Sequence, residues 1–457
     1  MKTRFKNELG IDLTSVLIPK SGIDINKWAV VACDQYTSEP EYWQKVSSFV
    51  GNSPSTLNLI FPEVYLEREN QDEKQKRIFN INKCMGEYLD NNYFSEIENS
   101  MIYIERTTYR EEGSSGKTRK GLIFAVDLDN YDFSADSQTL IRATEGTIID
   151  RLPPRIRIRE KACLELPHIM LLIDDPECKT IEPLSIHKKR MNNLYSFDLM
   201  LNGGHLEGYQ LNDESLLEEI LESLKKLKSP QTFYKKYNVD SPFCPLLFAV
   251  GDGNHSLATA KACWELMKPS LSKDELETHP SRYALIELVN VHDSGLEFEP
   301  IHRVLFNVDS TGLLSSFVSF YRNEGLKCGY ETVSDKKNIP PDSLDRHIIP
   351  FVSSGKNGYI WADKPRFTLD VGTLQYFLDA YLKENNNVEI DYVHGDDVVE
   401  RLGRQEQNMG FILSPMEKAD LFKTVILEGA LPRKTFSMGE AREKRFYLEC
   451  RNISVKR

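Results

Sequence analysis

The sequence predicts a mixed α/β protein with more than one domain. Short apolar runs of strand length alternate along the chain with segments whose apolar residues recur every three or four positions, as on one face of a helix. The chain has 457 residues, which is too long for one ordinary hydrophobic core. Hydrophobic residues make up 40% and charged residues 28% of the chain, a balance typical of globular proteins.

We expect three successive portions. These are an N-terminal α/β portion (residues 1–136), a central portion (residues 137–307) and a C-terminal α/β portion (residues 308–457). Apolar runs predict strands at residues 28–32, 101–106, 121–128, 168–173, 246–250, 283–290 and 358–362. Helical periodicity predicts helices at residues 72–90, 214–228, 313–326, 372–384, 398–402 and 415–428.

An arginine-rich segment lies in the central portion. It contains Arg142, Arg151, Arg155, Arg157 and Arg159. The pair Pro153-Pro154 argues against a regular helix here, and the alternation of arginine and isoleucine over residues 155–159 suits a strand with one charged face. Such a face either binds phosphate or carboxylate groups or is exposed to water and acidic neighbours.

The most informative stretch covers residues 245–267, PLLFAVGDGNHSLATAKACWELM. An apolar run of strand length leads into the tight turn of residues 251–255. A helical segment follows, with one apolar face formed by Leu257, Ala260, Trp264 and Met267. A strand, a glycine turn and a helix start direct free N–H groups and the positive end of the helix dipole at one spot. That spot suits an anion such as phosphate.

Each residue of this turn has a plausible local role. Gly251 and Gly253 can adopt positive φ and allow a ligand close to the backbone. Asp252 or Asn254 can cap the helix through a side-chain oxygen. His255 can donate to an anion or act as an acid or base near neutral pH. The same pattern also fits a strand-to-helix connection that binds nothing.

Several stretches together resemble one family. They are CDQYTSEPEYW (residues 33–43), RATEGTIIDRLPPR (142–155), GDGNHSLATA (251–260), EPIHR (299–303), YVHG (392–395) and LPRKTFSMGEAREKRFYLE (431–449). On these motifs the chain is identified as a member of the bacterial domain-of-unknown-function family 1015. The resemblance spans nearly the whole sequence. Members usually carry arginine after the histidine of the glycine turn, whereas this chain has Ser256. Serine cannot clamp a phosphate bidentately as arginine can, so another basic residue supplies the charge or the ligand differs.

The family in turn resembles the group that holds ParB, sulfiredoxin and the archaeal free-serine kinase. This resemblance implies that the central portion is a ParB/sulfiredoxin-like nucleotide-binding module. It also implies ATP or ADP as cofactor, with Mg²⁺ bridging the phosphates and no metal ligand set in the protein itself. The leading expectation is a nucleotide-dependent small-molecule kinase that phosphorylates a hydroxyl acceptor, with free serine as the first candidate.

The expected site combines residues from the central and C-terminal portions. Thr144-Glu145 resembles a glutamate motif of the free-serine kinase, so Glu145 would orient or deprotonate the acceptor. The segment of residues 299–303 places glutamate, histidine and arginine together, which suits acid/base and anion-binding roles. The expected catalytic residues are Glu145, His255 and His302. The expected nucleotide contacts are Gly251, Asp252, Gly253, Asn254, His255, Ser256, Arg142, Arg151, Arg155, Arg303, Arg433 and Lys434.

The basic residues near the C-terminus have two interpretations. Arg433, Lys434, Arg442, Lys444 and Arg445 crowd a short span that could close over a phosphate or form a basic surface strip.

Two other functions stay open. One is a nucleotide-binding or nucleotide-hydrolysing switch, for which we would expect nucleotide-dependent association such as a homodimer. The other is a ligand-binding protein without catalysis. The chain lacks GxxxxGK[ST] and HExxH motifs. Sulfiredoxin-like chemistry is disfavoured, because Asn254 stands where that family needs cysteine.

Charge and cysteine usage limit the partners. The net charge of −12 and the pI of about 5.4 disfavour nucleic acid and anionic membranes. No apolar run is long enough to cross a bilayer. The first residues lack the apolar core of a signal peptide, and the eight cysteines form no CxxC pair. We therefore expect a cytoplasmic protein whose partners are a nucleotide and a small-molecule substrate.

Overall fold

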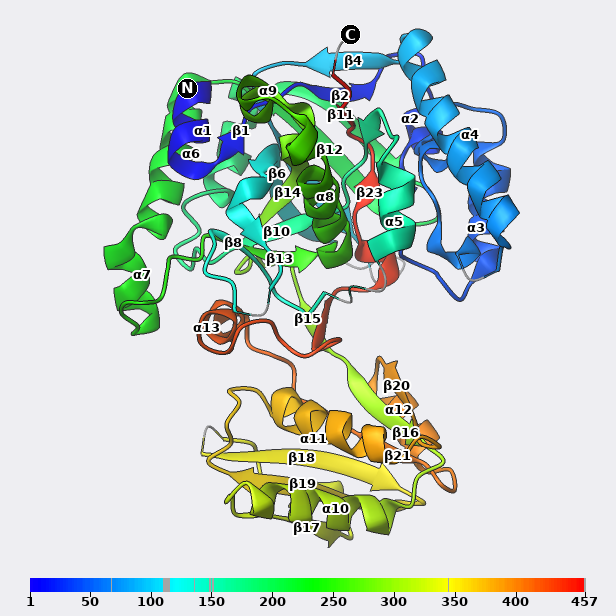
Figure 1. The fold of residues 1–457 in the computed structure, drawn as a ribbon, viewed down its shortest axis with the longest axis vertical. Coiled ribbons are helices and arrows are strands. Elements are labelled where there is room, and N and C mark those ends of the chain that lie inside the picture. Colours follow the sequence, from blue (N-terminus) through cyan, green and yellow to red (C-terminus); the bar gives the residue numbers. More distant parts are fainter. Residues whose placement is uncertain are drawn as a thin grey trace. The chain divides into compact units, whose positions relative to one another are not determined.

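In the computed structural model, the chain forms two compact units (Figure 1). The first unit comprises Met1–Glu297 and Gly439–Arg457, and the second comprises Phe298–Met438. The structure describes residues 1–66, 68–109, 116–134, 136–147, 149, 152–343 and 345–455. Both units combine helices with sheets, so the predicted mixed α/β class is confirmed.

A large mixed sheet forms the centre of the first unit. Its described strands follow the order β11-β12-β5-β6-β14-β10-β13-β8-β7, and β1 pairs with β6. The pairs β10–β14, β13–β8 and β7–β8 are parallel, and the other pairs are antiparallel. The strands are β1 (Ile11–Asp12), β5 (Met101–Thr108), β6 (Lys117–Asp127), β7 (Tyr131–Asp132), β8 (Ile141–Ala143), β10 (Met170–Ile173), β11 (Asn192–Leu199), β12 (Gly204–Leu211), β13 (Phe248–Asp252) and β14 (Tyr283–Asn290).

This sheet joins the regions that we expected as separate N-terminal and central portions. Strand β6 comes from residues 1–136 and β14 from residues 137–307, and the two pair along most of their length. Strand β5 pairs in the same way with β12. The two regions therefore share one sheet and lie within one unit.

Hydrophobic side chains cover both faces of the sheet. Ile102 and Ile104 of β5 pack into one core cluster. Their neighbours Met101 and Tyr103 pack into another, on the opposite face. The second cluster contains the apolar stripes of α6 and α8. The helices of the first unit are α1 (Lys2–Leu9), α2 (Ile25–Trp28), α3 (Pro40–Val50), α4 (Gln71–Asp90), α5 (Leu152–Arg159), α6 (Glu214–Lys228), α7 (Pro230–Tyr237), α8 (Asn254–Met267) and α9 (Lys273–Thr278).

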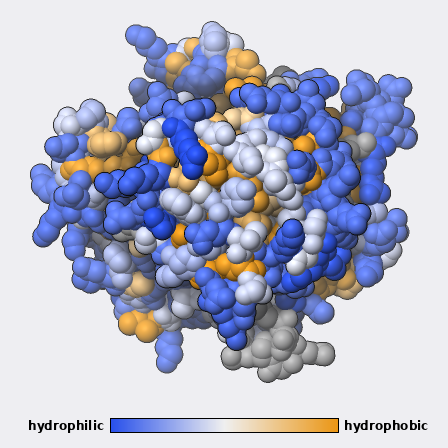
Figure 2. Space-filling view, turned by 90° about the horizontal axis from the view of Figure 1, so that it is seen from below, coloured by the Kyte–Doolittle hydropathy of each residue, from blue (hydrophilic) through white to orange (hydrophobic). Residues whose placement is uncertain are grey.

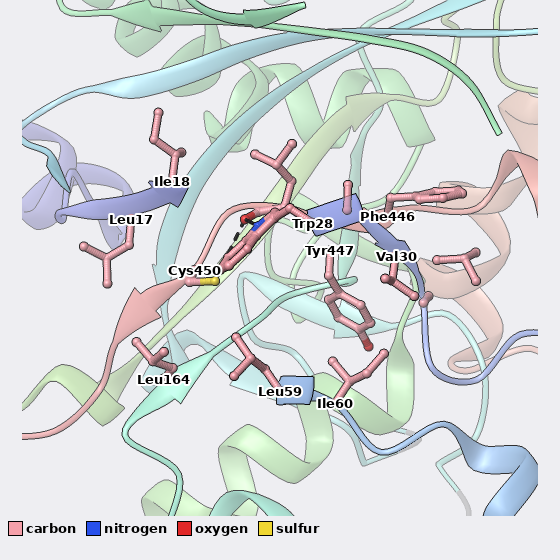
Figure 3. Close-up of a cluster of buried hydrophobic side chains, with 14 of the residues drawn as sticks. Leu17, Ile18, Trp28, Val30, Leu59, Ile60, Leu164, Phe446, Tyr447 and Cys450 are labelled. Atoms are coloured by element: carbon pink, nitrogen blue, oxygen red, sulfur yellow. Dashed lines mark hydrogen bonds between the residues drawn. The ribbon is translucent and has the colours of Figure 1, made fainter. Parts of the chain in front are cut away.

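The C-terminal segment, residues 439–455, returns to the first unit after the second unit. Its strand β23 (Phe446–Tyr447) pairs with β3 (Val30–Val31), and its strand β24 (Arg451–Asn452) pairs with β9 (Leu164–Glu165). Strand β2 (Val16–Pro19) pairs with β4 (Phe94–Ile97) nearby. Figure 3 shows β3 beside β23 in a core of buried side chains, where Trp28 Nε1 donates to the Leu448 carbonyl at 2.9 Å. The two ends of the chain are therefore folded together.

The arginine-rich segment is a helix. We expected a strand over residues 155–159, and this expectation is wrong, because the segment belongs to α5. Pro153 and Pro154 occupy the first turn of α5, where a proline leaves no intrahelical hydrogen bond unmade and its fixed φ suits a helix. Helix α5 packs against α8.

The second unit has its own sheet and core. Among its described residues the sheet order is β17-β19-β18-β21-β16-β20, and β15 pairs separately with β22. Its core holds Phe317, Phe377 and Phe411. The elements are β15 (Phe298–Pro300), β16 (His302–Phe306), α10 (Ser310–Asn323), β17 (Cys328–Val333), β18 (Arg346–Ser353), β19 (Lys356–Asp363), α11 (Asp370–Glu384), β20 (Glu389–Val393), α12 (Asp396–Gly403), β21 (Met409–Phe411), α13 (Lys418–Glu428) and β22 (Phe436–Met438).

The surface is mostly polar on the face that Figure 2 shows. Hydrophilic residues cover most of that face, and hydrophobic residues form small, separate patches. In the part of the chain that the structure describes, no helix is both long enough and apolar enough to span a lipid bilayer.

Candidate functional site

The glycine turn lies between β13 and α8, as the sequence predicts. Gly253 is the N-cap residue of α8, with φ at +77°. A Cβ atom there would lie 3.0 Å from Ile169 Cα, so both the backbone conformation and the space require glycine. The expected side-chain cap by Asp252 or Asn254 is wrong, because α8 has no side-chain cap. Asp252 Oδ1 instead accepts a hydrogen bond from the Gly253 N–H at 2.9 Å.

Strand β8 places Glu145 at this end of the sheet. It runs parallel to β13 with Ala143 opposite Val250. The Thr144 hydroxyl donates to the Val250 carbonyl at 2.6 Å. Continuing the parallel register by two residues brings Glu145 alongside Asp252, at the carboxyl ends of both strands.

Strand β10 approaches the turn from the other side of β13. The two strands are antiparallel, with Met170 opposite Asp252. The residues just before β10 therefore lie beside the turn. His168 is one of them, since its Cδ2 atom is 3.5 Å from the position that a Gly253 Cβ would take.

The C-terminal segment contributes a cation to the turn. Lys444 Nζ lies 3.1 Å from Asp252 Oδ2, and the two side chains are 13% and 25% exposed. The basic residues of this segment were expected either to approach a phosphate or to form a surface strip. Lys444 is partly buried at the turn itself and so is not part of an exposed surface strip.

Three residues form a chain of polar contacts next to the turn. His168 Nδ1 lies 2.6 Å from the Tyr447 hydroxyl, and His168 Nε2 lies 3.6 Å from Asp34 Oδ2. The Tyr447 hydroxyl is also 3.1 Å from Cys33 Sγ and accepts from the Cys33 N–H at 3.3 Å. We call Asp34, His168 and Tyr447 the Asp–His–Tyr chain.

The charges around Asp34 favour its ionised form. Burial raises the pKa of Asp34, but His168, the amide of Gln35 and Lys444 together hold it below its ordinary value. Gln35 Nε2 donates to Asp34 Oδ1 at 3.0 Å. At the neighbouring residue, Cys33, burial is the dominant effect and raises the pKa of the thiol. Cys33 is therefore a protonated, unreactive thiol at neutral pH.

An ion pair between Glu63 and Arg155 lies beside the same chain. Arg155 of α5 donates to Glu63 Oε1, and the Glu63 N–H donates to the Cys33 carbonyl at 2.8 Å. Burial raises the pKa of Glu63 although Arg155 lowers it. Arg155, expected as a nucleotide contact, is thus near the turn but paired with a carboxylate.

The Arg142 side chain holds neighbouring segments of the backbone together. Its side chain is buried and donates to the carbonyls of Thr139 at 2.9 Å and Cys244 at 2.6 Å. Burial lowers its pKa to about 10. These contacts fasten the loop before β13 rather than face the turn. Arg151 lies outside the described residues.

His255 and Ser256 occupy the first turn of α8, and both are half-buried. Their predicted contacts with a ligand stay predictions.

His302 lies in the second unit and is buried there. Its Nδ1 accepts from the Leu413 N–H at 3.1 Å, and its Nε2 lies 3.0 Å from Asp396 Oδ1. Burial lowers its pKa. The described contacts therefore tie β16 to the segment after β21 and to the start of α12.

Arg303, Arg433 and Lys434 also belong to the second unit. The Arg303 guanidinium is fully buried. It donates to Gln375 Oε1 at 3.1 Å and to the carbonyls of Lys434 at 2.9 Å and Arg433 at 3.1 Å. Arg433 itself donates to the Tyr392 hydroxyl at 2.9 Å. Arg303 thus holds the segment before β22 in place.

Sequence reasoning did not single out Asp34, Glu63, His168 or Tyr447. A weak signal existed for three of them, because Asp34 and Tyr447 lie in the motifs of residues 33–43 and 431–449 and His168 begins a predicted strand. Nothing in the spacing showed that these segments meet. Among the described residues, no group of three or more histidine, cysteine, aspartate or glutamate side chains is arranged to hold a metal ion.

The glycine turn of this mixed α/β unit is thus flanked by carboxylates and one lysine at the strand ends. The family model described as a protein of unknown function (DUF1015) matches residues 17–381. The chain therefore belongs to this family, as its motifs predict. The comparison with curated proteins found no match.

Several solved structures are similar to this chain. A conserved hypothetical protein from Pyrococcus furiosus has 11% identity and a TM-score of 0.34, covering 71% of this chain and 90% of that chain. A free serine kinase in complex with AMP has 10% identity and a TM-score of 0.38, covering 75% and 95%. SbnI from Staphylococcus aureus, with a C-terminal truncation, has 9% identity and a TM-score of 0.34, covering 69% and 82%. With TM-scores below 0.5, these similarities carry no argument about function.

Proposed function

We propose that the first unit binds a nucleotide together with Mg²⁺ and transfers a phosphoryl group to a small hydroxyl acceptor. The observation that carries this proposal is the turn between β13 and α8. There the open end of a 14-residue helix meets Lys444 and the carboxyl ends of two parallel strands. Free serine is the first acceptor to test, by the resemblance of Thr144-Glu145 to the kinase motif.

The backbone of the turn supports binding of a phosphate. The first N–H groups of a helix have no partner within it and point outward with the positive end of the dipole. In α8 these groups include the N–H groups of Asn254 and Ser256. Two buried polar atoms at this end of the sheet, Asn254 Oδ1 and Thr147 Oγ1, have no hydrogen-bond partner among the described residues. Buried polar groups normally have partners, so a polar ligand suits this position.

The charges support a nucleotide complexed with Mg²⁺ over a free anion. Four carboxylates lie around the turn, those of Asp34, Glu63, Glu145 and Asp252, against the cations Lys444 and Arg155. A bare polyphosphate would be repelled by this balance. Mg²⁺ neutralises phosphate charge and takes only one or two protein carboxylates, because it retains waters. Asp252 and Glu145, at the strand ends, are the residues that fit that role.

Thermal unfolding tests the binding step. We expect MgATP or MgADP at a hundred times its Kd to stabilise the folded protein by about 2.7 kcal/mol. ADP with EDTA, and MgCl₂ alone, should shift the melting temperature much less. An unchanged melting temperature with every common nucleotide in the presence of Mg²⁺ contradicts the proposal.

Lys444 gives the sharpest binding variant. We expect Lys444→Ala to raise the Kd for MgADP about 10- to 100-fold, since a hydrogen bond to a charged group contributes about 1.5–3 kcal/mol. The matched control is Lys45→Ala, because Lys45 is exposed on α3. Calorimetry on both variants measures the difference, and equal Kd values would place the nucleotide elsewhere.

Labelled ATP tests the transfer step. Label should move to serine or to another small alcohol in a panel of hydroxyl compounds. Release of label as inorganic phosphate alone would instead indicate a nucleotide-hydrolysing switch.

A further inference from the structure

The Asp–His–Tyr chain has no role in the site that the sequence suggested. Its members come from three distant segments: Asp34 follows β3, His168 precedes β10, and Tyr447 lies on β23. The β3–β23 ladder brings Asp34 and Tyr447 together, and the start of β10 brings His168 to the glycine turn. All three belong to the first unit.

We propose that Asp34, positioned by His168 and Tyr447, is the carboxylate that accepts the proton of the acceptor hydroxyl. This inference rests on the phosphoryl transfer proposed above and assigns its base to Asp34 instead of Glu145. Asp34 is then a catalytic residue, and His168 and Tyr447 are positioning residues.

The hydrogen bonds fix the orientation of the chain. Burial raises the pKa of the Tyr447 hydroxyl well above its ordinary value, so it keeps its proton. The Tyr447 hydroxyl lies 2.6 Å from His168 Nδ1 and donates to Cys33 Sγ at 3.1 Å. The other ring nitrogen, Nε2, faces Asp34 Oδ2 at 3.6 Å. Tyr447 therefore holds the imidazole with Nε2 towards Asp34.

The phenol itself is held rigidly. Figure 3 shows the Tyr447 ring among the core side chains, with its hydroxyl end pointing away from Trp28. The Cys33 N–H donates to the hydroxyl oxygen at 3.3 Å, and the Tyr447 and His168 rings meet edge to face at 5.5 Å. A rotation of either ring would break these contacts, so the position of His168 is well defined.

Asp34 retains the capacity to accept another hydrogen bond. Its side chain is 29% exposed, and among the contacts described its oxygens face Gln35 Nε2, His168 Nε2 and its own backbone N–H. A carboxylate offers about four acceptor positions. Lys444 is close enough to lower the pKa of Asp34 and also contacts Asp252 at the turn. Asp34 thus lies beside the proposed phosphate site and is ionised before the acceptor binds.

The proposed step is balanced with ATP as the phosphoryl donor. The acceptor oxygen forms a bond to the γ-phosphorus, and the bond from that phosphorus to the β–γ bridging oxygen breaks. The bridging oxygen keeps the electron pair and leaves as part of ADP. The hydroxyl proton passes to Asp34, as it passes to an aspartate in protein kinases.

The test compares two carboxylates in the full-length protein. We expect Asp34→Asn to lower kcat for phosphoryl transfer by about 10²- to 10⁴-fold, the usual range for removing a general base, with the Kd for MgADP unchanged. Glu145→Gln should instead weaken binding of MgADP, because Glu145 is proposed above as a Mg²⁺ ligand. Asp90→Asn, at the exposed end of α4, is the matched control. Normal kcat in Asp34→Asn, or a complete loss in Glu145→Gln with full activity in Asp34→Asn, overturns the assignment.

The positioning residues have their own readout. Tyr447→Phe removes only the hydroxyl and keeps the ring in the core. We expect it to lower kcat about tenfold with little change in KM, and to add almost nothing when combined with Asp34→Asn, because residues acting as a unit are not additive. Full additivity of the two substitutions would mean that Tyr447 has only a structural role.

Different results would contradict the proposed function and the proposed role of Asp34. A wild-type protein that binds no nucleotide contradicts the proposed function. A wild-type protein that binds nucleotide and transfers phosphate, with Asp34→Asn equally active, contradicts only the role of Asp34.

Discussion

At the scale of single residues, one buried carboxyl group should make the stability of the second unit depend on pH. Asp370 is 6% exposed, and burial raises its pKa to about 6 although the Ser414 N–H donates to it. The folded state therefore binds this proton more tightly than the unfolded state does. The contribution to stability is present at low pH and is lost as the pH rises through about 6.

We expect Asp370→Asn to remove most of this pH dependence, which is at most about 3 kcal/mol between pH 4 and pH 7. Hydrogen exchange of amides in β18 and β19 measures the free energy of unfolding of this unit alone. Asp391→Asn is the control, because Asp391 is exposed on β20. If the free energy of unfolding of Asp370→Asn depends on pH as strongly as that of the wild type, another group titrates.

Residue chemistry alone did not show which of the candidate side chains lie at the glycine turn. The sequence located the glycine turn correctly, since a turn is a local pattern. It also selected His302 and Arg303, whose chemistry suits catalysis but whose described partners lie in the framework of the second unit. It did not select His168 or Tyr447, because their neighbours are determined by pairing between segments hundreds of residues apart.

At the scale of secondary-structure elements, buried ion pairs fasten the C-terminal segment to the central sheet. Glu287 of β14 is 1% exposed. It accepts from Arg119 of β6 at 3.0 Å and from Arg445 of the C-terminal segment at 2.7 Å. Arg445 also donates to Glu449 at 2.7 Å. Lys444 and Tyr447 flank Arg445, so this contact positions the segment that completes the candidate site.

Glu287→Gln should destabilise the first unit by about 3–5 kcal/mol, because it leaves two buried guanidinium groups without their shared carboxylate. Urea unfolding measures the loss. Glu219→Gln, on the exposed face of α6, should change stability by less than about 0.5 kcal/mol. If the two variants unfold at the same urea concentration, the buried network contributes nothing to holding the segment.

Secondary-structure elements were predictable where one hydrophobic pattern dominates the segment. The expected bounds of α6 and β14 coincide with those observed, because an apolar stripe and a continuous apolar run leave few alternatives. Helix α5 was mistaken for a strand, because alternating arginine and isoleucine imitates a strand and proline was taken as a helix breaker. Position within the helix decides the effect of proline, and sequence periodicity does not reveal that position.

At the scale of the whole molecule, the second unit is an insertion into the chain of the first. The ends of the insertion are paired, with Phe298 opposite Met438 in the β15–β22 ladder. Sequence reasoning placed portions one after another along the chain. It had no local signal that the last residues, 439–455, would return to the first unit and pair with β3 and β9.

This arrangement predicts that each unit folds without the other. Glu297 and Gly439 flank a pair of adjacent antiparallel strands, whose Cα atoms lie about 5 Å apart, so a linker of a few glycine and serine residues should join them. We expect residues 298–438 expressed alone to unfold cooperatively, because they enclose their own core. We also expect the linked first unit to retain its stabilisation by MgADP, since the glycine turn, Lys444 and Asp34 all belong to it. A linked first unit that folds but no longer binds nucleotide would instead mean that binding needs His302, Arg303, Arg433 or Lys434, as the sequence first suggested.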